Sequence, residues 1–115
     1  MNDTVLNQLY EVVKDRKANP QEGSYTCYLF DKGLNKILKK VGEECAETII
    51  AAKEENKEEL AGEICDLIYH LVVMAVEKGI DIKEILAELD IRSKKIGNLK
   101  KIGRASCRER VCLYV

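Results

Sequence analysis

Four acidic side chains are spaced so that they could share one metal ion. Glu44 and Glu47 form one i,i+3 couplet, and Glu63 and Asp66 form a second, set symmetrically about residue 55. On a helix, each couplet places its two carboxylates on one face. A helical hairpin turning near residues 54–57 would put Glu44 opposite Asp66 and Glu47 opposite Glu63. Clustered carboxylates repel one another, and a hard divalent cation with oxygen ligands removes that cost. The spacing therefore points to Mg²⁺-dependent phosphate chemistry.

The alternative is that these carboxylates lie on solvated helix faces, as most charge runs do. Two observations argue against it. Glu43, Glu44 and Glu47 make like-charge i,i+3 and i,i+4 pairs, which cost ~0.2–0.5 kcal/mol each in isolated helices. Asp66 lies within the most apolar stretch, ICDLIYHLVVMAV, although Asp is a poor helix former. The pattern alone leaves both interpretations open.

Lysines near the couplets also have two interpretations. Lys32, Lys36 and Lys40 form an i, i+4, i+8 stripe that runs toward the carboxylates, and lysines so placed could bind phosphates. The alternative is an ordinary solubilising surface, in which Lys40 pairs with Glu43 or Glu44.

His70 follows Glu63 and Asp66 along one helical line. A lone histidine is more often a hydrogen-bonded core or interface residue than a metal ligand, and we expect the former here. The chain has no Gly-rich phosphate loop, no HExxH motif and no plausible Ser-His-Asp order. The expected nucleophile is therefore water activated at the metal site.

Helix-forming residues dominate the chain, and no strand-like alternation of useful length occurs, so we predict an all-α fold. The predicted helices span residues 4–17, 25–32, 34–55, 57–78 and 82–96. Short connections predict antiparallel neighbours. We expect Ser24 to cap the second helix and Gly79 to follow the end of the fourth.

Apolar stripes predict which face of each long helix is buried. In the 34–55 helix the predicted core positions are Leu34, Leu38, Val41, Cys45, Thr48, Ile49 and Ala52. In the 57–78 helix they are Leu60, Ile64, Leu67, Ile68, Leu71, Val72 and Ala75. Cys45 and Cys65 fall inside these patterns, so we expect them to be free, buried thiols.

Composition excludes several classes of protein. The 115 residues carry 19 basic and 20 acidic side chains, a formal charge of −1, and 46% hydrophobic residues. This balance predicts one domain with a core and no nucleic-acid partner. No apolar h-region and no run of 18 apolar residues occurs, so we expect no membrane partner and no secretion. The five cysteines lack CxxC spacing, which favours the reducing cytoplasm.

The last stretch, residues 103–115, differs from the rest of the chain. It reads GRASCRERVCLYV and holds three of the five arginines and two of the five cysteines. We expect it to be an expression-derived or read-through tail, outside a domain that spans residues 1–102. The alternative is a genuine C-terminal strand or peptide.

The residues around the couplets resemble a known family. EECAE (43–47), fifteen intervening residues and EICD (63–66) resemble the EExxE…ExxD signature of the MazG-like all-α nucleoside-triphosphate pyrophosphatase superfamily. The wider context, SYTCYLFDKGLNKILKKVGEECAETIIAAK and then EICDLIYHLVV, is similar to the phosphoribosyl-ATP pyrophosphatases. The resemblance covers about residues 6–99.

This resemblance implies Mg²⁺-dependent hydrolysis of phosphoribosyl-ATP to phosphoribosyl-AMP and pyrophosphate, the second step of histidine biosynthesis. The implied metal ligands are Glu44, Glu47, Glu63 and Asp66. Glu43 matches the leading Glu of the motif, so Glu43, Glu44 and Glu47 are the candidate catalytic residues; which of them accepts the proton is left open.

The resemblance also implies phosphate contacts and a partner. Lys40 stands just before the motif, with Lys36 one turn earlier, and both are candidate phosphate contacts. Arg92 and Lys95 match a basic C-terminal segment that can close over the triphosphate. The family works as an intertwined homodimer, so a MazG-like bundle with a four-helix core completed by a second copy is expected.

Two other functions stay open. A housekeeping pyrophosphatase of the same superfamily, acting on free NTPs or dNTPs, would share the four ligands, although the SYT…KKVGEE context argues against it. A non-catalytic helical dimerisation module would carry the acidic cluster as mere surface.

Overall fold

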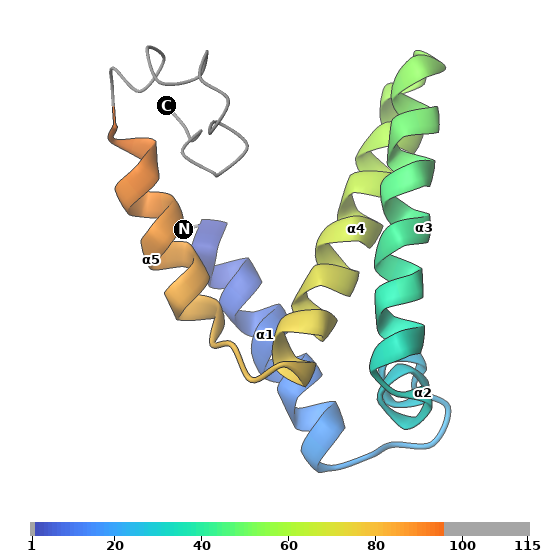
Figure 1. Ribbon diagram of the computed structural model, residues 1–115, viewed down its shortest axis with the longest axis vertical. Coiled ribbons are helices and arrows are strands. Elements are labelled where there is room, and N and C mark those ends of the chain that lie inside the picture. Colours follow the sequence, from blue (N-terminus) through green and yellow to red (C-terminus); the bar gives the residue numbers. More distant parts are fainter. Residues whose placement is uncertain (1, 96–115) are drawn as a thin grey trace, which may run out of the picture. The chain divides into compact units, whose positions relative to one another are not determined.

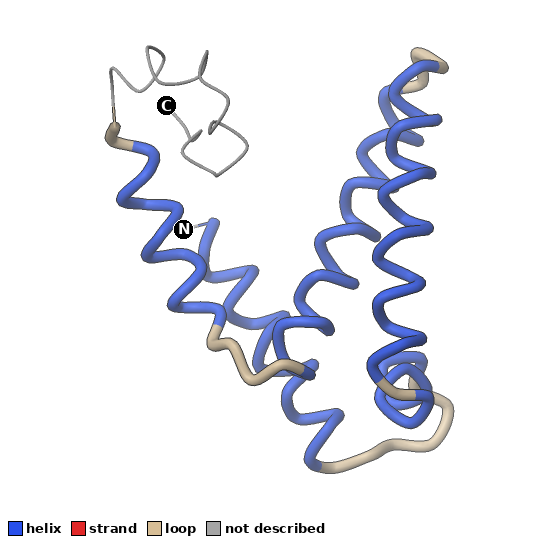
Figure 2. The backbone as a smooth tube through the Cα atoms, in the orientation of Figure 1, coloured by secondary structure: helices blue, strands red, loops and turns tan. Residues whose placement is uncertain are grey.

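The computed structural model describes residues 2–95, with side chains from residue 5 onward. Within this range it is all-helical, as predicted. The helices, drawn in Figures 1 and 2, are α1 (Asn2–Ala18), α2 (Tyr25–Lys32), α3 (Leu34–Lys53), α4 (Lys57–Glu77) and α5 (Ile82–Ser93). The predicted tail, residues 103–115, lies outside the described residues.

The predicted helix positions agree with the structure to within a few residues at each end. The 25–32 helix is confirmed at both ends, whereas α3 stops at Lys53, two residues before its predicted end. There the Glu54 N–H bonds the Ala51 carbonyl at 3.1 Å, and Glu55 adopts a left-handed φ of 56°. This short turn directs the chain back into α4.

Side-chain caps explain where α2 and α4 begin. The Ser24 hydroxyl accepts a hydrogen bond from the Cys27 N–H at 3.1 Å, as predicted. The Asn56 side-chain oxygen accepts one from the Glu59 N–H at 3.0 Å. Each such cap satisfies a backbone donor that has no partner within its helix.

Gly79 follows the end of α4, as predicted, with a φ of 77° that L side chains rarely adopt. The Gly79 N–H bonds the Val76 carbonyl at 3.1 Å, and the Ile80 N–H bonds the Ala75 carbonyl at 2.8 Å. These bonds satisfy carbonyls that the helix leaves without partners.

The described residues divide into two units, one that reaches to Ile82 and one that begins at Lys83, and each is described by itself. In the first unit α3 and α4 run side by side as an antiparallel hairpin (Figure 1). Helix α1 packs on α4, and α2 contacts both α1 and α3. None of the helices in the described residues is long and apolar enough to cross a membrane.

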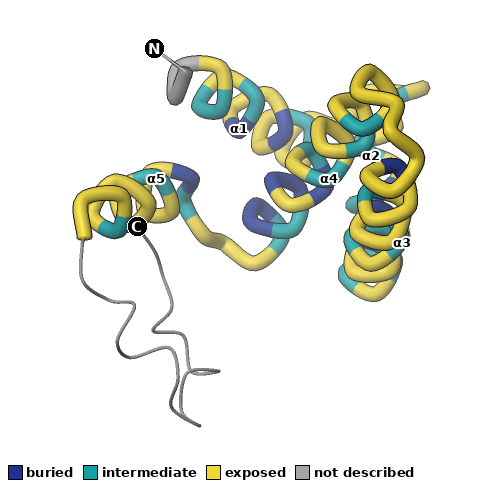
Figure 3. Tube along the Cα trace, turned by 90° about the horizontal axis from the view of Figure 1, so that it is seen from above, coloured by how far each residue is buried: buried dark blue, intermediate teal, exposed yellow. Residues whose placement is uncertain are grey.

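The core of the first unit lies where these four helices meet. The most completely buried side chains are Val13 of α1, Leu29 of α2, Ile37 of α3 and Val73 of α4. Figure 3 shows most of the α3 surface as exposed or intermediate. The core is therefore concentrated where α1 and α2 cover the hairpin.

Most of the predicted inward positions of α3 and α4 are not buried in the single chain, although Val72 and Ala75 of α4 are buried as predicted. Leu38, Ile49, Ile64 and Ile68 are exposed, by 44%, 64%, 41% and 40%. The buried residues of α3 are instead Ile37, Glu44 and Ala51. The reason is that each helix of a two-helix hairpin covers only a narrow stripe of the other.

The predicted burial of two thiols is also wrong. Cys45 and Cys65 are free but exposed. Both cysteines lie on the apolar faces of α3 and α4 that no other described helix of the first unit covers. Membership of an apolar stripe was therefore not enough to predict whether they are buried.

Candidate active site

Three of the predicted carboxylates converge in the hairpin. Glu44 from α3 and Glu63 and Asp66 from α4 each present an oxygen, and these oxygens lie within 4.8 Å of one another. The i,i+3 spacing places Glu63 and Asp66 on one face of α4, and the antiparallel pairing brings Glu44 against that face. Such a group of hard oxygen donors suits Mg²⁺.

Two oxygens of this group lack any hydrogen-bond donor. Glu44 is only 7% exposed, and its Oε1 is buried without a partner. The Oε1 of Glu63 is also buried without a hydrogen-bond partner. A buried carboxylate oxygen without a partner is unfavourable, because it has lost its hydrogen bonds to water. A cation bound between these oxygens would remove that cost, so the residues present fit a divalent metal ion.

The pKa of the Glu63 carboxyl is raised above its ordinary value. Loss of solvent raises the pKa of Glu63, and repulsion from Glu47 and Glu44 raises it further. Glu47 also shares a hydrogen bond with Glu63, which favours the protonated acid. Glu47 is thus next to Glu63 but outside the group formed by Glu44, Glu63 and Asp66.

A polar hollow continues from this site along the hairpin. Its volume is about 340 Å³, and its lining includes Glu47, Glu54, Glu59 and Glu63. The apolar part of the lining comes from Ile50 and Ala51. The hollow gives solvent, and therefore a cation, access to the hairpin beside Glu63.

Lys40 forms ion pairs with two glutamates: Glu43, which precedes the cluster in the sequence, and Glu44, which belongs to it. Its Nζ lies 3.2 Å from an oxygen of Glu43 and 3.9 Å from Oε2 of Glu44. The hydrogen bond from Lys40 lowers the pKa of Glu43, and the same bond raises the pKa of Lys40. Lys40 therefore keeps Glu43 ionised and holds positive charge at the edge of the cluster.

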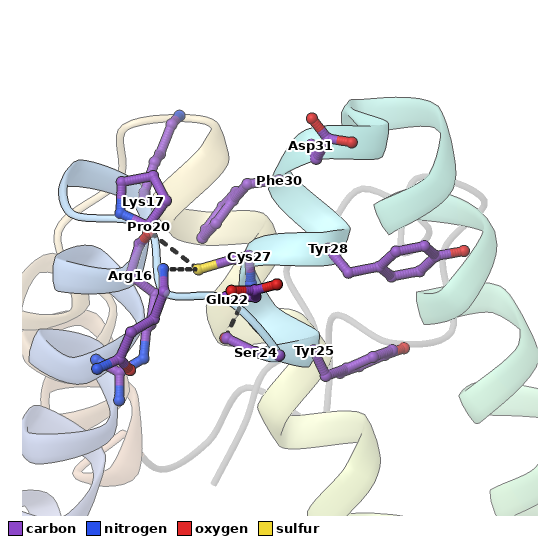
Figure 4. A pocket seen from close by; sticks show the side chains of 12 residues that line it. Arg16, Lys17, Pro20, Glu22, Ser24, Tyr25, Cys27, Tyr28, Phe30 and Asp31 are labelled. Atoms are coloured by element: carbon purple, nitrogen blue, oxygen red, sulfur yellow. Dashed lines mark hydrogen bonds between the residues drawn. The ribbon is translucent and has the colours of Figure 1, made fainter.

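Lys32 and Lys36 lie near the same aromatic ring. Their Nζ atoms stand 5.8 and 5.9 Å from the ring centroid of Tyr28, respectively. These are cation–π distances. Figure 4 shows Tyr28 on α2, on the side that faces α3.

Arg92 and Lys95 belong to the second unit and are described within it. Arg92 Nε donates to Oε2 of Glu88 at 2.7 Å, and the Lys95 N–H bonds the Arg92 carbonyl at 3.2 Å. Their contact with a triphosphate remains a prediction.

His70 is a buried, hydrogen-bonded residue, as expected. It is 5% exposed. Its Nδ1 lies 2.7 Å from the backbone oxygen of Asp66. Its Nε2 lies 3.0 Å from the Tyr25 hydroxyl. A carbonyl oxygen can only accept, so Nδ1 carries a proton and both ring nitrogens are engaged by protein groups.

Tyr25 was not predicted to be part of the site. Its hydroxyl bonds His70. Burial raises the pKa of Tyr25, nearby Lys40 lowers it, and nearby Glu44 raises it. The hydroxyl therefore lies within electrostatic reach of the cluster. No spacing rule connects residue 25 with residues 40 and 70, so the sequence pattern carried no signal for it.

Thr48 lies between the two helices of the hairpin. Its hydroxyl is 2.7 Å from the Glu44 carbonyl and 3.3 Å from the Glu63 carbonyl. It was predicted as a core position, but its role is to join the backbones of two cluster residues.

Another hollow lies elsewhere in the first unit. A cavity of about 780 Å³ is lined by the end of α1, the following loop and α2. Figure 4 shows Cys27 and Phe30 on the side of α2 toward Arg16 and Lys17. The Cys27 thiol donates to the Arg16 carbonyl at 3.4 Å. None of the three clustered carboxylates lines this cavity.

Comparison with known proteins supports one family. A family model described as phosphoribosyl-ATP pyrophosphohydrolase matches residues 6–93. The chain is 56% identical over 99 residues to the phosphoribosyl-ATP pyrophosphatase of Clostridium novyi, covering 86% of this chain and 90% of that protein. It is 57% identical over 100 residues to that of Clostridium acetobutylicum, covering 87% and 91%.

A longer relative also matches. The chain is 58% identical over 91 residues to the histidine biosynthesis bifunctional protein HisIE of Caldanaerobacter subterraneus, covering 79% of this chain and 44% of that protein. The family match contains the whole hairpin with its clustered carboxylates. This chain belongs to the phosphoribosyl-ATP pyrophosphohydrolase family.

Proposed function

We propose that this protein hydrolyses phosphoribosyl-ATP to phosphoribosyl-AMP and pyrophosphate, the second step of histidine biosynthesis, with Mg²⁺ as its cofactor. The observation that best supports this proposal is the convergence of Glu44, Glu63 and Asp66 in a chain whose relatives are named phosphoribosyl-ATP pyrophosphatase.

Glu44, Glu63 and Asp66 would hold the metal ion, with Glu47 beside them as the fourth proposed ligand. When bound, Mg²⁺ neutralises phosphate charge, polarises the scissile anhydride and lowers the pKa of a water molecule. The two partnerless carboxylate oxygens support this assignment, because a cation would satisfy both.

The remaining acidic residues would handle the proton. Glu43 is kept ionised by Lys40, and Glu47 reaches the cluster through Glu63. Either can accept the proton of the attacking water as the anhydride between the α and β phosphorus atoms breaks and pyrophosphate leaves.

Basic residues would hold the substrate. Lys40 sits at the edge of the cluster, and Lys36 lies one turn earlier on α3, over Tyr28. We propose that both contact phosphate oxygens. Arg92 of α5 and Lys95, which follows α5, stay proposed phosphate contacts of the second unit.

We also propose a homodimer. The single hairpin leaves a broad apolar surface exposed on α3 and α4. Its large members are Leu38, Ile49, Ile50, Ile64, Ile68 and Leu71. Exposed apolar surface of this extent marks an interaction site, and a second hairpin would cover it and complete a four-helix core.

The proposed location is the cytoplasm. Cys27, Cys45 and Cys65 are free thiols, which suits a reducing compartment. Neither nucleic acid nor membrane is proposed as a partner, because the formal charge is only −1.

A substrate panel tests the proposal. Pyrophosphate release would be measured with phosphoribosyl-ATP, ATP and dNTPs, each with Mg²⁺ and with a chelator. We expect release from phosphoribosyl-ATP that the chelator abolishes. Release mainly from free nucleotides would identify a housekeeping pyrophosphatase, and no release from any substrate would favour a non-catalytic dimerisation module.

A further inference from the structure

Tyr25 of α2 is linked by hydrogen bonds to the side of the cluster that α4 carries. On α4, its hydroxyl lies 3.0 Å from Nε2 of His70, and Nδ1 of His70 donates to the Asp66 carbonyl at 2.7 Å. When the ring is neutral, its proton lies on Nδ1, so Nε2 accepts the hydrogen bond that the Tyr25 hydroxyl donates. The tyrosine is thereby tied to the helical turn that carries Asp66.

Toward α3, the same hydroxyl lies within electrostatic reach of Lys40 and Glu44. Lys40 in turn lies 3.9 Å from Oε2 of Glu44. Hydrogen bonds thus join the Tyr25 hydroxyl of α2 to the Asp66 carbonyl through His70, while Lys40 and Glu44 form an ion pair on α3.

We propose that Tyr25 is a positioning residue for the carboxylate cluster: through His70 it sets the placement of Asp66 relative to Glu44, and so raises the affinity of the cluster for a divalent cation. The inference rests on the proposed metal role of the cluster. Groups that orient metal ligands in this way typically contribute about 10- to 100-fold in metal affinity or activity.

A neighbouring pair provides a matched control. The Tyr69 hydroxyl of α4 hydrogen-bonds the Thr26 hydroxyl of α2. This bond joins the same two helices as the Tyr25–His70 bond, and its residues are direct chain neighbours of that pair. Neither Tyr69 nor Thr26 contacts the clustered carboxylates in the described structure.

The test compares Tyr25→Phe with Tyr69→Phe. Each variant keeps its ring and loses one hydroxyl that joins α2 to α4. Mn²⁺ binding would be followed without substrate by the electron paramagnetic resonance signal of the free ion, and unfolding by heat would be recorded for both variants. We expect Tyr25→Phe to weaken Mn²⁺ binding about tenfold, and Tyr69→Phe to change it less than twofold. Equal effects of the two substitutions would overturn the proposal.

A double-mutant cycle tests the route through His70. If Tyr25 acts through this ring, Tyr25→Phe adds little to the loss of Mn²⁺ affinity already caused by His70→Gln. Losses that multiply would overturn the proposed path. In the assay of pyrophosphate release, Tyr25→Phe should raise the Mg²⁺ concentration for half-activation more than it lowers kcat at saturating Mg²⁺.

These readouts separate the inference from the proposed function. A parent protein that binds Mn²⁺ but does not hydrolyse phosphoribosyl-ATP would contradict the proposed reaction, while the binding comparison would still decide the role of Tyr25. A parent that binds no Mn²⁺ would overturn this inference together with the metal part of the proposed function.

Discussion

Glu44 and Glu63 approach each other from opposite helices of one hairpin, and each buries a carboxylate oxygen that no hydrogen-bond donor reaches. The hydroxyl of Thr48 lies between their backbone carbonyls. The hairpin therefore holds two mutually repelling groups in place.

Replacing Glu63 should stabilise the metal-free protein. Burial and the neighbouring glutamates raise the pKa of Glu63 in the folded chain. A raised carboxyl pKa lowers stability once the pH exceeds the unfolded value, and the penalty grows until the pH passes the folded value. Glu63→Gln should thus gain stability at pH 7 and lose that advantage near pH 3. Urea unfolding in the presence of chelator measures it.

Glu58→Gln is the control for this experiment. Glu58 lies in the first turn of α4, where an anion is favourable, so its replacement should bring no gain. Equal stability of Glu63→Gln and the parent at pH 7 would contradict the raised pKa.

Mg²⁺ should stabilise the parent protein against heat. A ligand that binds only the folded state at one hundred times its dissociation constant contributes ~2.7 kcal/mol. For a domain of this size the increase in Tm is on the order of ten degrees. Glu44→Gln should lose most of the increase, because it removes a buried ligand. Calorimetric scans with MgCl₂, matched in ionic strength by NaCl, distinguish the specific effect from charge screening.

The hairpin and its surroundings differ in how far sequence could predict them. The meeting of Glu44 with Glu63 and Asp66 follows from i,i+3 spacing and one turn, which are local properties of the chain. The Tyr25–His70 bond depends on where α2 packs, and no local rule specifies that. The inward faces were mispredicted because burial of Ile49 depends on which surface covers it, not on its own apolar character.

Dimerisation should depend on the exposed faces of the hairpin. Ile68 is 40% exposed in the single chain, and a charge there would have to be buried against a second copy. We expect the parent to sediment as a dimer and Ile68→Glu as a monomer in analytical ultracentrifugation. Val12→Glu, at an exposed residue of α1, is the control and should sediment with the same mass as the parent. A parent that sediments as a monomer would contradict the proposed homodimer.

The turn that brings the carboxylates together should depend on the cap of α4. Asn56→Ala removes the side-chain oxygen that accepts the Glu59 N–H, and loss of such a cap typically costs ~1 kcal/mol. Asn56→Asp keeps an acceptor and should retain most of the stability. Urea midpoints of the two variants, compared with that of the parent, give the difference.

The most direct test of the account is Mg²⁺-dependent pyrophosphate release from phosphoribosyl-ATP by the parent and by Asp66→Asn. Asparagine keeps the size of Asp66 but removes the charge that the cluster offers to a cation. We predict that the variant folds as stably as the parent or more so, and that its pyrophosphate release is nearly abolished at any Mg²⁺ concentration. Release at the parent rate would contradict the assignment of this cluster as the catalytic metal site.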